Sequence, residues 1–260
     1  MSGPWTEPAP GPGRRPQGPD RRTTIWVIAV VALLLVLVRT HHVSAFTVLV
    51  FAALIPSVIV HEVSHGVVAL AFGDDTAKRA GRLTLNPVKH VDPFGTIILP
   101  AILAFSGSGS VFGWAKPVPV NVGKLRRPRN QNVAVALVGP AVNVVMAVVF
   151  ALAYRYLVPV SAKFGPSGFF IPIDSQSTWV QLVFVAGYVN VILAVFNSIP
   201  LPPLDGSAVV ERLLPARLLP GYYRIRPFTM FLPLLVVLLY PQALQHVFQP
   251  FLNEWARLLG

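Results

Sequence analysis

The sequence of 260 residues contains no cysteine, which excludes disulfide bonds and thiolate metal sites. Any metal must therefore be bound by imidazole and carboxylate groups, a donor set that suits zinc without selecting it uniquely. Charged residues are also scarce: they make up 12% of the chain, whereas soluble domains carry roughly 25%. With 54% hydrophobic residues and a mean hydropathy of +0.63, the composition indicates an integral membrane protein.

Acidic residues are few, and Glu62 is the single charged residue in the apolar stretch 43–72. A charged side chain at membrane depth is costly and therefore indicates function. Glu62 belongs to the pattern H-E-V-S-H, in which His61 and His65 are one helical turn apart on the same face and can hold one metal ion. Glu62 can then act as a general base toward water activated by that metal. A chance match is the alternative, but unpaired His and Glu side chains would be penalised in this apolar setting, which favours a metal site.

Long apolar runs predict an all-α, polytopic membrane protein with about five transmembrane helices. The predicted spans are Ile25 to Val38, Val43 to Phe72, Val133 to Ala153, Trp179 to Pro200, and Phe228 to Tyr240, the last a full span only if it continues toward Val247. The shorter run 94–106 favours a re-entrant segment within a β-like, membrane-associated loop region. Residues 1–24, rich in Pro, Gly and Arg, predict a disordered tail before a domain at 25–260 with its core at 45–215. An amphipathic helix at the membrane interface is expected at the C-terminal end.

The net charge of +11 could indicate nucleic-acid binding, but the distribution of basic residues favours membrane topology instead. With a cytoplasmic N-terminal tail and a re-entrant segment at 94–106, 17 of the 21 Lys and Arg residues fall on the cytoplasmic side. This asymmetry follows the positive-inside rule. Lipid headgroups then explain the basic segments, so the bilayer is an expected partner and nucleic acid is not. The same topology brings residues 61–65 and 197–206 to one depth, toward the cytoplasmic side.

Catalytic zinc usually has three protein ligands, so a third ligand is needed beside the two histidines. Asp205 is the best candidate, because the prolines and glycine around it break the preceding apolar helix and can turn a carboxylate back toward the metal. Taken alone, Asp205 would more simply be a helix cap or turn residue. The other candidates are His41, His42, His90, Asp92, Asp174, Glu211 and His246. The topology places His41, His42 and Asp174 on the opposite side, and His90 and Asp92 are expected to brace a loop.

Five motifs in order along residues 45–215 closely resemble the site-2 protease family of intramembrane zinc metalloproteases, in its compact bacterial form. The motifs are HEVSHG from residue 61, NPVKHVDPFGT from 86, GWAKPVPVN from 113, GPAVN from 139 and PPLDG from 202. The resemblance implies one zinc ion per chain, held by His61, His65 and Asp205, with Glu62 activating water. It also implies that Asn143 lies near the site and helps to hold the substrate or the oxyanion.

The resemblance further implies a multi-pass endopeptidase of the bacterial plasma membrane that acts in regulated intramembrane proteolysis. The expected substrate is a single-span membrane protein, cut in or near its transmembrane segment. No inserted PDZ domain and no C-terminal nucleotide-sensing domain are expected.

Three alternatives remain open. Asn143 can equally serve as an interhelical hydrogen-bonding residue. Residues 118–122 can either pair with a substrate as an added strand or form a plain connecting loop. The whole chain can instead be a metal-binding transporter that uses intramembrane His and Asp residues, a function in which Glu62 would have no role as a base.

Overall fold

The computed structural model describes residues 45–92, 95, 115–158, 177–229, 235 and 241–260, all within the second of two compact units, residues 44–260. Regular structure in this part of the chain is helical, and no β-strand occurs in it. The long helices are α2 (Ala45–Ala71), α5 (Pro128–Leu157), α7 (Thr178–Ser198) and α11 (Pro241–Leu258). The short ones are α3 (Thr76–Arg79), α8 (Ser207–Leu213) and α9 (Leu219–Thr229), with 3-10 turns at Pro87–His90, Val122–Lys124 and Ala216–Leu218.

Three helices are long and apolar enough to cross a membrane, namely Phe46–Ala71 in α2, all of α5 and all of α7. They confirm that three of the predicted spans are apolar helices of sufficient length. The outer face of α5 is apolar too, as contact with lipid requires, and exposes Val144, Val145, Val148, Val149 and Leu152. The predicted tail, the span at 25–38, nearly all of the re-entrant segment 94–106 and most of the run 228–240 lie outside the described residues.

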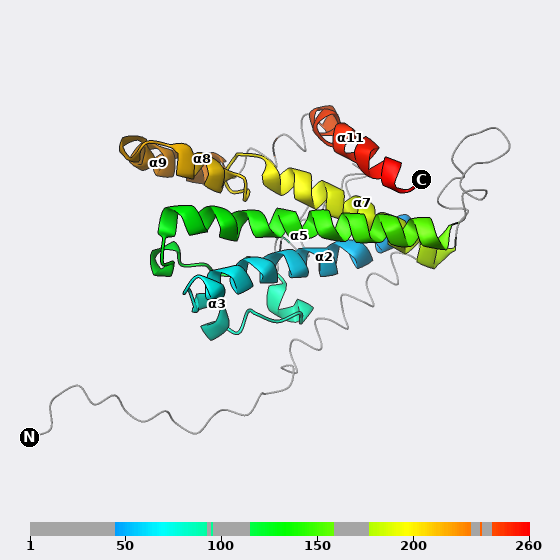
Figure 1. Cartoon of the computed structure of the whole chain (residues 1–260), viewed down its shortest axis with the longest axis horizontal. Coiled ribbons are helices and arrows are strands. Elements are labelled where there is room, and N and C mark those ends of the chain that lie inside the picture. The colour runs from blue at the N-terminus through cyan, green and yellow to red at the C-terminus, as the bar shows by residue number, and fades with distance from the viewer. Residues whose placement is uncertain (1–44, 93–94, 96–114, 159–176, 230–234, 236–240) are drawn as a thin grey trace, which may run out of the picture. The chain divides into compact units, whose positions relative to one another are not determined.

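Small and polar residues recur at every fourth position on the buried faces of α2 and α5. In α2 this buried stripe consists of Ala53, Ser57, His61, His65 and Ala69. In α5 it consists of Val135, Gly139, Asn143, Ala147 and Ala151. Residues spaced by four form the ridges that fit into the grooves of a neighbouring helix, and small side chains let the backbones come close. Because α2, α5 and α7 contact one another pairwise, the stripes lie inside a three-helix bundle (Figure 1).

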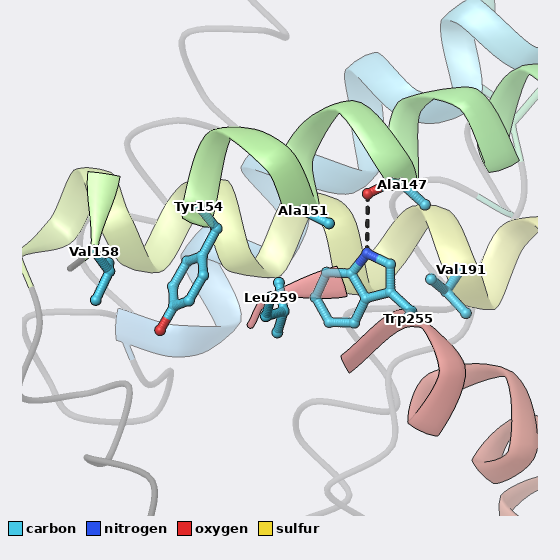
Figure 2. Close-up of a cluster of buried hydrophobic side chains, with 7 residues drawn as sticks. All are labelled: Ala147, Ala151, Tyr154, Val158, Val191, Trp255 and Leu259. Carbon is cyan, nitrogen blue, oxygen red and sulfur yellow. Dashed lines mark hydrogen bonds between the residues drawn. The ribbon is translucent and has the colours of Figure 1, made fainter. Parts of the chain in front are cut away.

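The helix α11 docks on this bundle through Trp255 (Figure 2). The Trp255 indole Nε1–H donates to Ala147 O at 2.9 Å, and its ring lies 5.4 Å from that of Phe184. Gly187 of α7 makes room, since a Cβ at that position would overlap the indole. The predicted C-terminal amphipathic helix is therefore present and begins at Pro241. Part of its apolar face packs against the protein's own core, a use that the interfacial prediction did not anticipate.

Residues 115–121 show no β pairing among the described residues, where a β-like region was expected. Three backbone amides of this segment donate to groups outside any β-ladder. Their acceptors are His90 O for Lys116, Glu62 Oε2 for Val118 and Asp74 Oδ2 for Asn121. The segment is thereby fastened across the end of α2, next to Glu62.

Candidate metal centre

Two histidines of α2 and one aspartate from the far side of the sequence converge on one point. The Nε2 atoms of His61 and His65 lie 3.0 Å and 3.4 Å from Asp205 Oδ2. One ligand atom from each residue lies within 4.8 Å of the others, so the group can hold a metal ion. Both histidines are buried and Asp205 is partly buried. The structure thus brings together the three residues that the sequence singled out as ligands.

Asp205 reaches the histidines because the chain reverses tightly after α7. Gly206 N–H donates to Asn197 O at 2.7 Å, which folds the turn back onto the last residues of the helix. A Cβ on Gly206 would lie 2.6 Å from Ile199 O, so only glycine allows this close backbone contact. The proline- and glycine-rich pattern around Asp205 predicted this reversal.

The helix α8, which begins two residues after Asp205, is fastened to the start of α5. Arg129 Nη2 donates to Arg212 O at 3.1 Å and to Leu214 O at 2.7 Å, which satisfies carbonyls at the end of α8. Arg212 Nε in turn donates to Asn130 Oδ1 at 2.6 Å. These contacts hold the ligand-bearing segment at the end of the bundle where α2 finishes and α5 begins (Figure 1).

Both imidazole rings use Nδ1 for a hydrogen bond to oxygen. The Nδ1–H of His61 donates to Asn143 Oδ1 at 2.5 Å, and that of His65 donates to Val135 O at 2.6 Å. A neutral ring protonated at Nδ1 presents a lone pair at Nε2.

Two lone pairs and a carboxylate oxygen therefore face one another at hydrogen-bonding distance. Such a set of acceptors is repulsive by itself and is satisfied by a cation placed among them. Two imidazoles with oxygen-bonded Nδ1–H groups and one carboxylate also match the donor set of a catalytic zinc site. The residues present thus fit zinc.

Gly139 of α5 provides the space that the two rings occupy. A Cβ at this position would lie 2.6 Å from Cε1 of His61 and equally close to Cε1 and Nε2 of His65. Any larger residue at 139 would therefore push the rings out of place. The groups that pack closely against this glycine are thus the two histidine rings.

Glu62 lies beside the histidines but outside the converging group. Its side chain is partly exposed, and Oε2 accepts the Val118 N–H at 2.7 Å. The other carboxylate oxygen has no partner among the described residues. This placement leaves Glu62 able to exchange a proton, as a general base requires.

The remaining candidate ligands that the structure describes are engaged elsewhere. His90 Nε2 bonds to Thr84 O at 2.8 Å, and Asp92 Oδ1 accepts the Gly95 N–H at 2.7 Å, so both brace a loop. Glu211 accepts a hydrogen bond from the Tyr223 hydroxyl, and His246 Nδ1 bonds to Gln242 O. His41, His42 and Asp174 lie outside the described residues.

Asn143 is fully buried and bonded on both sides, to His61 and to Asn190 of α7. The interhelical interpretation of Asn143 is thus matched by its contacts, and its part in holding substrate or the oxyanion stays a prediction. Asn190 and its partner Ser57 were missed in the sequence. The available signal was the amide side chain of Asn190 in the middle of the mostly apolar run 179–200.

Comparison with known proteins relates the chain to metalloproteases. Peptidase family M50 matches residues 49–169 and 167–240, most of the chain. The chain is 42% identical over 168 residues to “Putative zinc metalloprotease YwhC” of Bacillus subtilis, an alignment that covers 62% of this chain and 67% of the relative. It is 31% identical over 165 residues to “Putative zinc metalloprotease Rip2” of Mycolicibacterium smegmatis, covering 63% of this chain and 56% of that relative. The Rip2 protein of Mycobacterium tuberculosis H37Rv matches at 30% identity, again over 56% of its length. No solved structure matches.

Proposed function

The chain belongs to peptidase family M50 and is a zinc metalloprotease of the membrane, and we propose that it cleaves peptide bonds in or near transmembrane segments of other membrane proteins. The observation that carries this proposal is the position of His61, His65 and Asp205. His61 and His65 lie on a helix long and apolar enough to span a bilayer, and Asp205 joins them from the turn after α7, which gives the three protein ligands that a catalytic zinc site needs. A site in that setting can meet a peptide bond that a soluble protease does not reach.

In the proposed reaction, His61, His65 and Asp205 hold zinc. Bound zinc lowers the pKa of water toward neutrality and polarises a carbonyl group. Glu62 takes a proton from the attacking water and passes it to the leaving amine, so it acts first as a base and then as an acid. The Val118 N–H holds one Glu62 oxygen at 2.7 Å and orients the carboxylate for this transfer.

The N-terminus is proposed to be cytoplasmic and the chain a multi-pass protein of the bacterial plasma membrane. The described basic residues support this orientation. The ends of α2 and α7 and the start of α5 lie at one end of the bundle (Figure 1), and the basic segments 78–89, 124–129 and 212–224 adjoin that end. A cytoplasmic face rich in Lys and Arg follows the positive-inside rule. The proposed substrate is a single-span membrane protein that enters the bundle from the lipid.

The transporter alternative finds no support in the comparisons, since the relatives are named as metalloproteases. Glu62 also argues against it, because it lies next to the ligands without joining them. In the proposed peptidase, Glu62 binds no metal and acts as the general base.

Glu62→Gln tests the proposal. Glutamine keeps an oxygen that can accept the Val118 N–H, so the variant should fold and bind zinc normally while losing the ability to take a proton. We expect cleavage of a single-span substrate, reconstituted with the full chain in lipid vesicles, to fall by about 100-fold or more.

Zinc content, measured on the same preparations, separates the possible outcomes. Wild type should hold one zinc ion per chain and lose cleavage with a chelator, and Asp205→Ala should lose most of its zinc. Undiminished cleavage by Glu62→Gln would contradict the role of the base. Full zinc affinity in Asp205→Ala would contradict the ligand set.

A further inference from the structure

Three polar side chains are completely enclosed within the membrane-spanning helices. Ser57 in α2 is 1% exposed, while Asn143 in α5 and Asn190 in α7 are 0% exposed. A buried polar group without a hydrogen-bond partner is costly, and the cost is greater where no water is available. These side chains persist because they bond to one another and, at one end, to His61.

The bonds run in a single series across all three helices. His61 Nδ1 lies 2.5 Å from Asn143 Oδ1, and Asn143 Nδ2 lies 2.6 Å from Asn190 Oδ1. Asn190 Nδ2 then lies 2.8 Å from Ser57 Oγ and 2.8 Å from Ala186 O. Ser57 Oγ finally donates to Ala53 O at 2.7 Å.

Two backbone carbonyls fix the direction of the whole series, because a carbonyl can only accept. Ala53 O takes the Ser57 hydroxyl proton, so Ser57 Oγ must accept from Asn190, and Ala186 O takes the second Asn190 N–H. Asn190 must therefore turn its oxygen toward Asn143, which must turn its own nitrogen toward Asn190 and its oxygen toward His61. Of its two neutral tautomers, His61 is left with only one, which carries a proton on Nδ1 and a lone pair on Nε2.

We propose that Asn143, Asn190 and Ser57 are positioning residues that keep His61 in the tautomer and ring orientation needed to bind zinc through Nε2. The inference rests on the proposed function, in which His61 is a zinc ligand. Asn143 acts directly on the ring, whereas Asn190 and Ser57 act through Asn143 by preventing its amide from turning over. His65 needs no such support, since its Nδ1–H donates to the backbone carbonyl of Val135.

Leucine substitutions test the series, because leucine is close to asparagine in size and suits an apolar bundle. Removing a group that orients a metal-binding histidine typically weakens metal affinity by about 10- to 100-fold. We expect Asn143→Leu and Asn190→Leu of the full chain each to lower zinc affinity within this range, measured by competition with a chromogenic chelator in lipid nanodiscs. The double variant should match Asn143→Leu alone, since the residues act in series.

Serine variants provide a matched pair. Ser57 and Ser198 both donate to the carbonyl four residues earlier, but only Ser57 also accepts from Asn190. Ser57→Ala should weaken zinc affinity by a few-fold, because Ala186 O still restrains Asn190, and Ser198→Ala should leave it unchanged. Equal effects of the two substitutions would contradict the series.

Nitrogen-15 NMR of histidine-labelled, zinc-free protein gives a readout that a general loss of packing would not produce. Wild type should show His61 protonated at Nδ1, whereas Asn190→Leu should give a mixture of tautomers at His61 with His65 unchanged. An unaltered His61 tautomer together with unaltered zinc affinity in Asn190→Leu would overturn the inference while leaving the protease proposal intact. A wild-type chain that binds no zinc would instead refute the proposed function.

Discussion

At the scale of single residues, the centre depends on how tightly a helix can approach two imidazole rings. Gly139 lets the α5 backbone lie directly against His61 and His65, and no side chain would fit there. Glycine within a helix ordinarily costs stability relative to alanine, by roughly 1 kcal/mol. Its presence in the middle of α5 therefore serves the space around the rings and not the helix itself.

Gly139→Ala should consequently separate helix stability from metal binding. We expect at least about a tenfold loss of zinc affinity, because the added Cβ displaces both rings, while helical content measured by circular dichroism is kept or slightly raised. Gly221→Ala in α9 is the control, since no atom lies within 4 Å of a Cβ built there. Unchanged zinc binding in Gly139→Ala would show that the rings do not depend on this contact.

At the scale of secondary-structure elements, Asp74 joins the end of α2 to the segment that lies next to Glu62. Its carboxylate is fully buried and accepts hydrogen bonds from Thr76 N–H at 3.0 Å, the Thr76 hydroxyl at 2.5 Å and Asn121 N–H at 2.6 Å. Burial acts to raise the pKa of Asp74, but the bonds from Thr76 and Asn121, with attraction from Lys124, outweigh it and hold the pKa below its ordinary value. The folded state therefore stabilises the ionised form of the Asp74 carboxyl group.

The lowered pKa of Asp74 determines how the stability of the folded chain depends on pH. The contribution of Asp74 to stability should be fully present above its ordinary pKa of about 3.9 and should be lost as the pH falls through the lower pKa of the folded state. At neutral pH, Asp74→Asn should cost about 1–3 kcal/mol, because one amide oxygen cannot replace two carboxylate oxygens.

Thermal unfolding of the wild-type and Asp74→Asn chains in detergent, compared from pH 7 down to pH 3, measures this difference. Asp75→Asn is the neighbouring control and should have a small effect, since the partly exposed Asp75 pairs at the surface with Lys124 and Arg79. A stability difference for Asp74→Asn that does not shrink in acid would contradict the assignment.

At the scale of the whole molecule, hydrogen bonds between buried side chains hold the three helices of the described bundle together. The series from His61 to Ser57 links α2, α5 and α7, and Asp205 adds the segment between α7 and α8. A metal bound to His61, His65 and Asp205 would therefore cross-link two parts of the chain that are 144 positions apart. Loss of the metal should loosen this connection.

Removing zinc should accordingly lower thermal stability. A ligand present at about 100 times its Kd stabilises the folded state by about 2.7 kcal/mol, which corresponds to roughly 5–10 °C in a protein of this size. We expect a chelator to lower the Tm of wild type and of Glu62→Gln by this amount, and to have little effect on Asp205→Ala. Equal chelator effects on all three chains would show that the metal acts elsewhere.

The sequence predicted the parts of this centre that a local pattern reveals. His61, Glu62 and His65 are recognisable because their spacing follows one helix and they interrupt an apolar run. Asp205 could be predicted because prolines and a glycine mark a chain reversal. Three of the predicted spans are apolar helices of sufficient length, since hydropathy alone indicates them.

The contacts among helices could not be predicted in the same way. The pairing of Asn143 with Asn190 and Ser57 depends on which faces of three helices meet, and no spacing within one helix indicates that. The docking of Trp255 against Gly187 has the same origin. For residues 118–122 the sequence left both a strand added to a substrate and a plain connecting loop open. In the described structure, residues 115–121 show no β pairing, and the amides of Lys116, Val118 and Asn121 bond to the carbonyl of His90 and to the side chains of Glu62 and Asp74.

The stripes of small residues along α2 and α5 determine which positions of this protein can accept substitutions. Most of their positions hold alanine, glycine or serine, so nearly every substitution there adds volume that the neighbouring helix cannot absorb. The outward valines and leucines, by contrast, can be exchanged for one another at little cost. Sequence drift in this chain should therefore be confined to its lipid-facing surface, and the interior should tolerate change only when both members of a contact alter together.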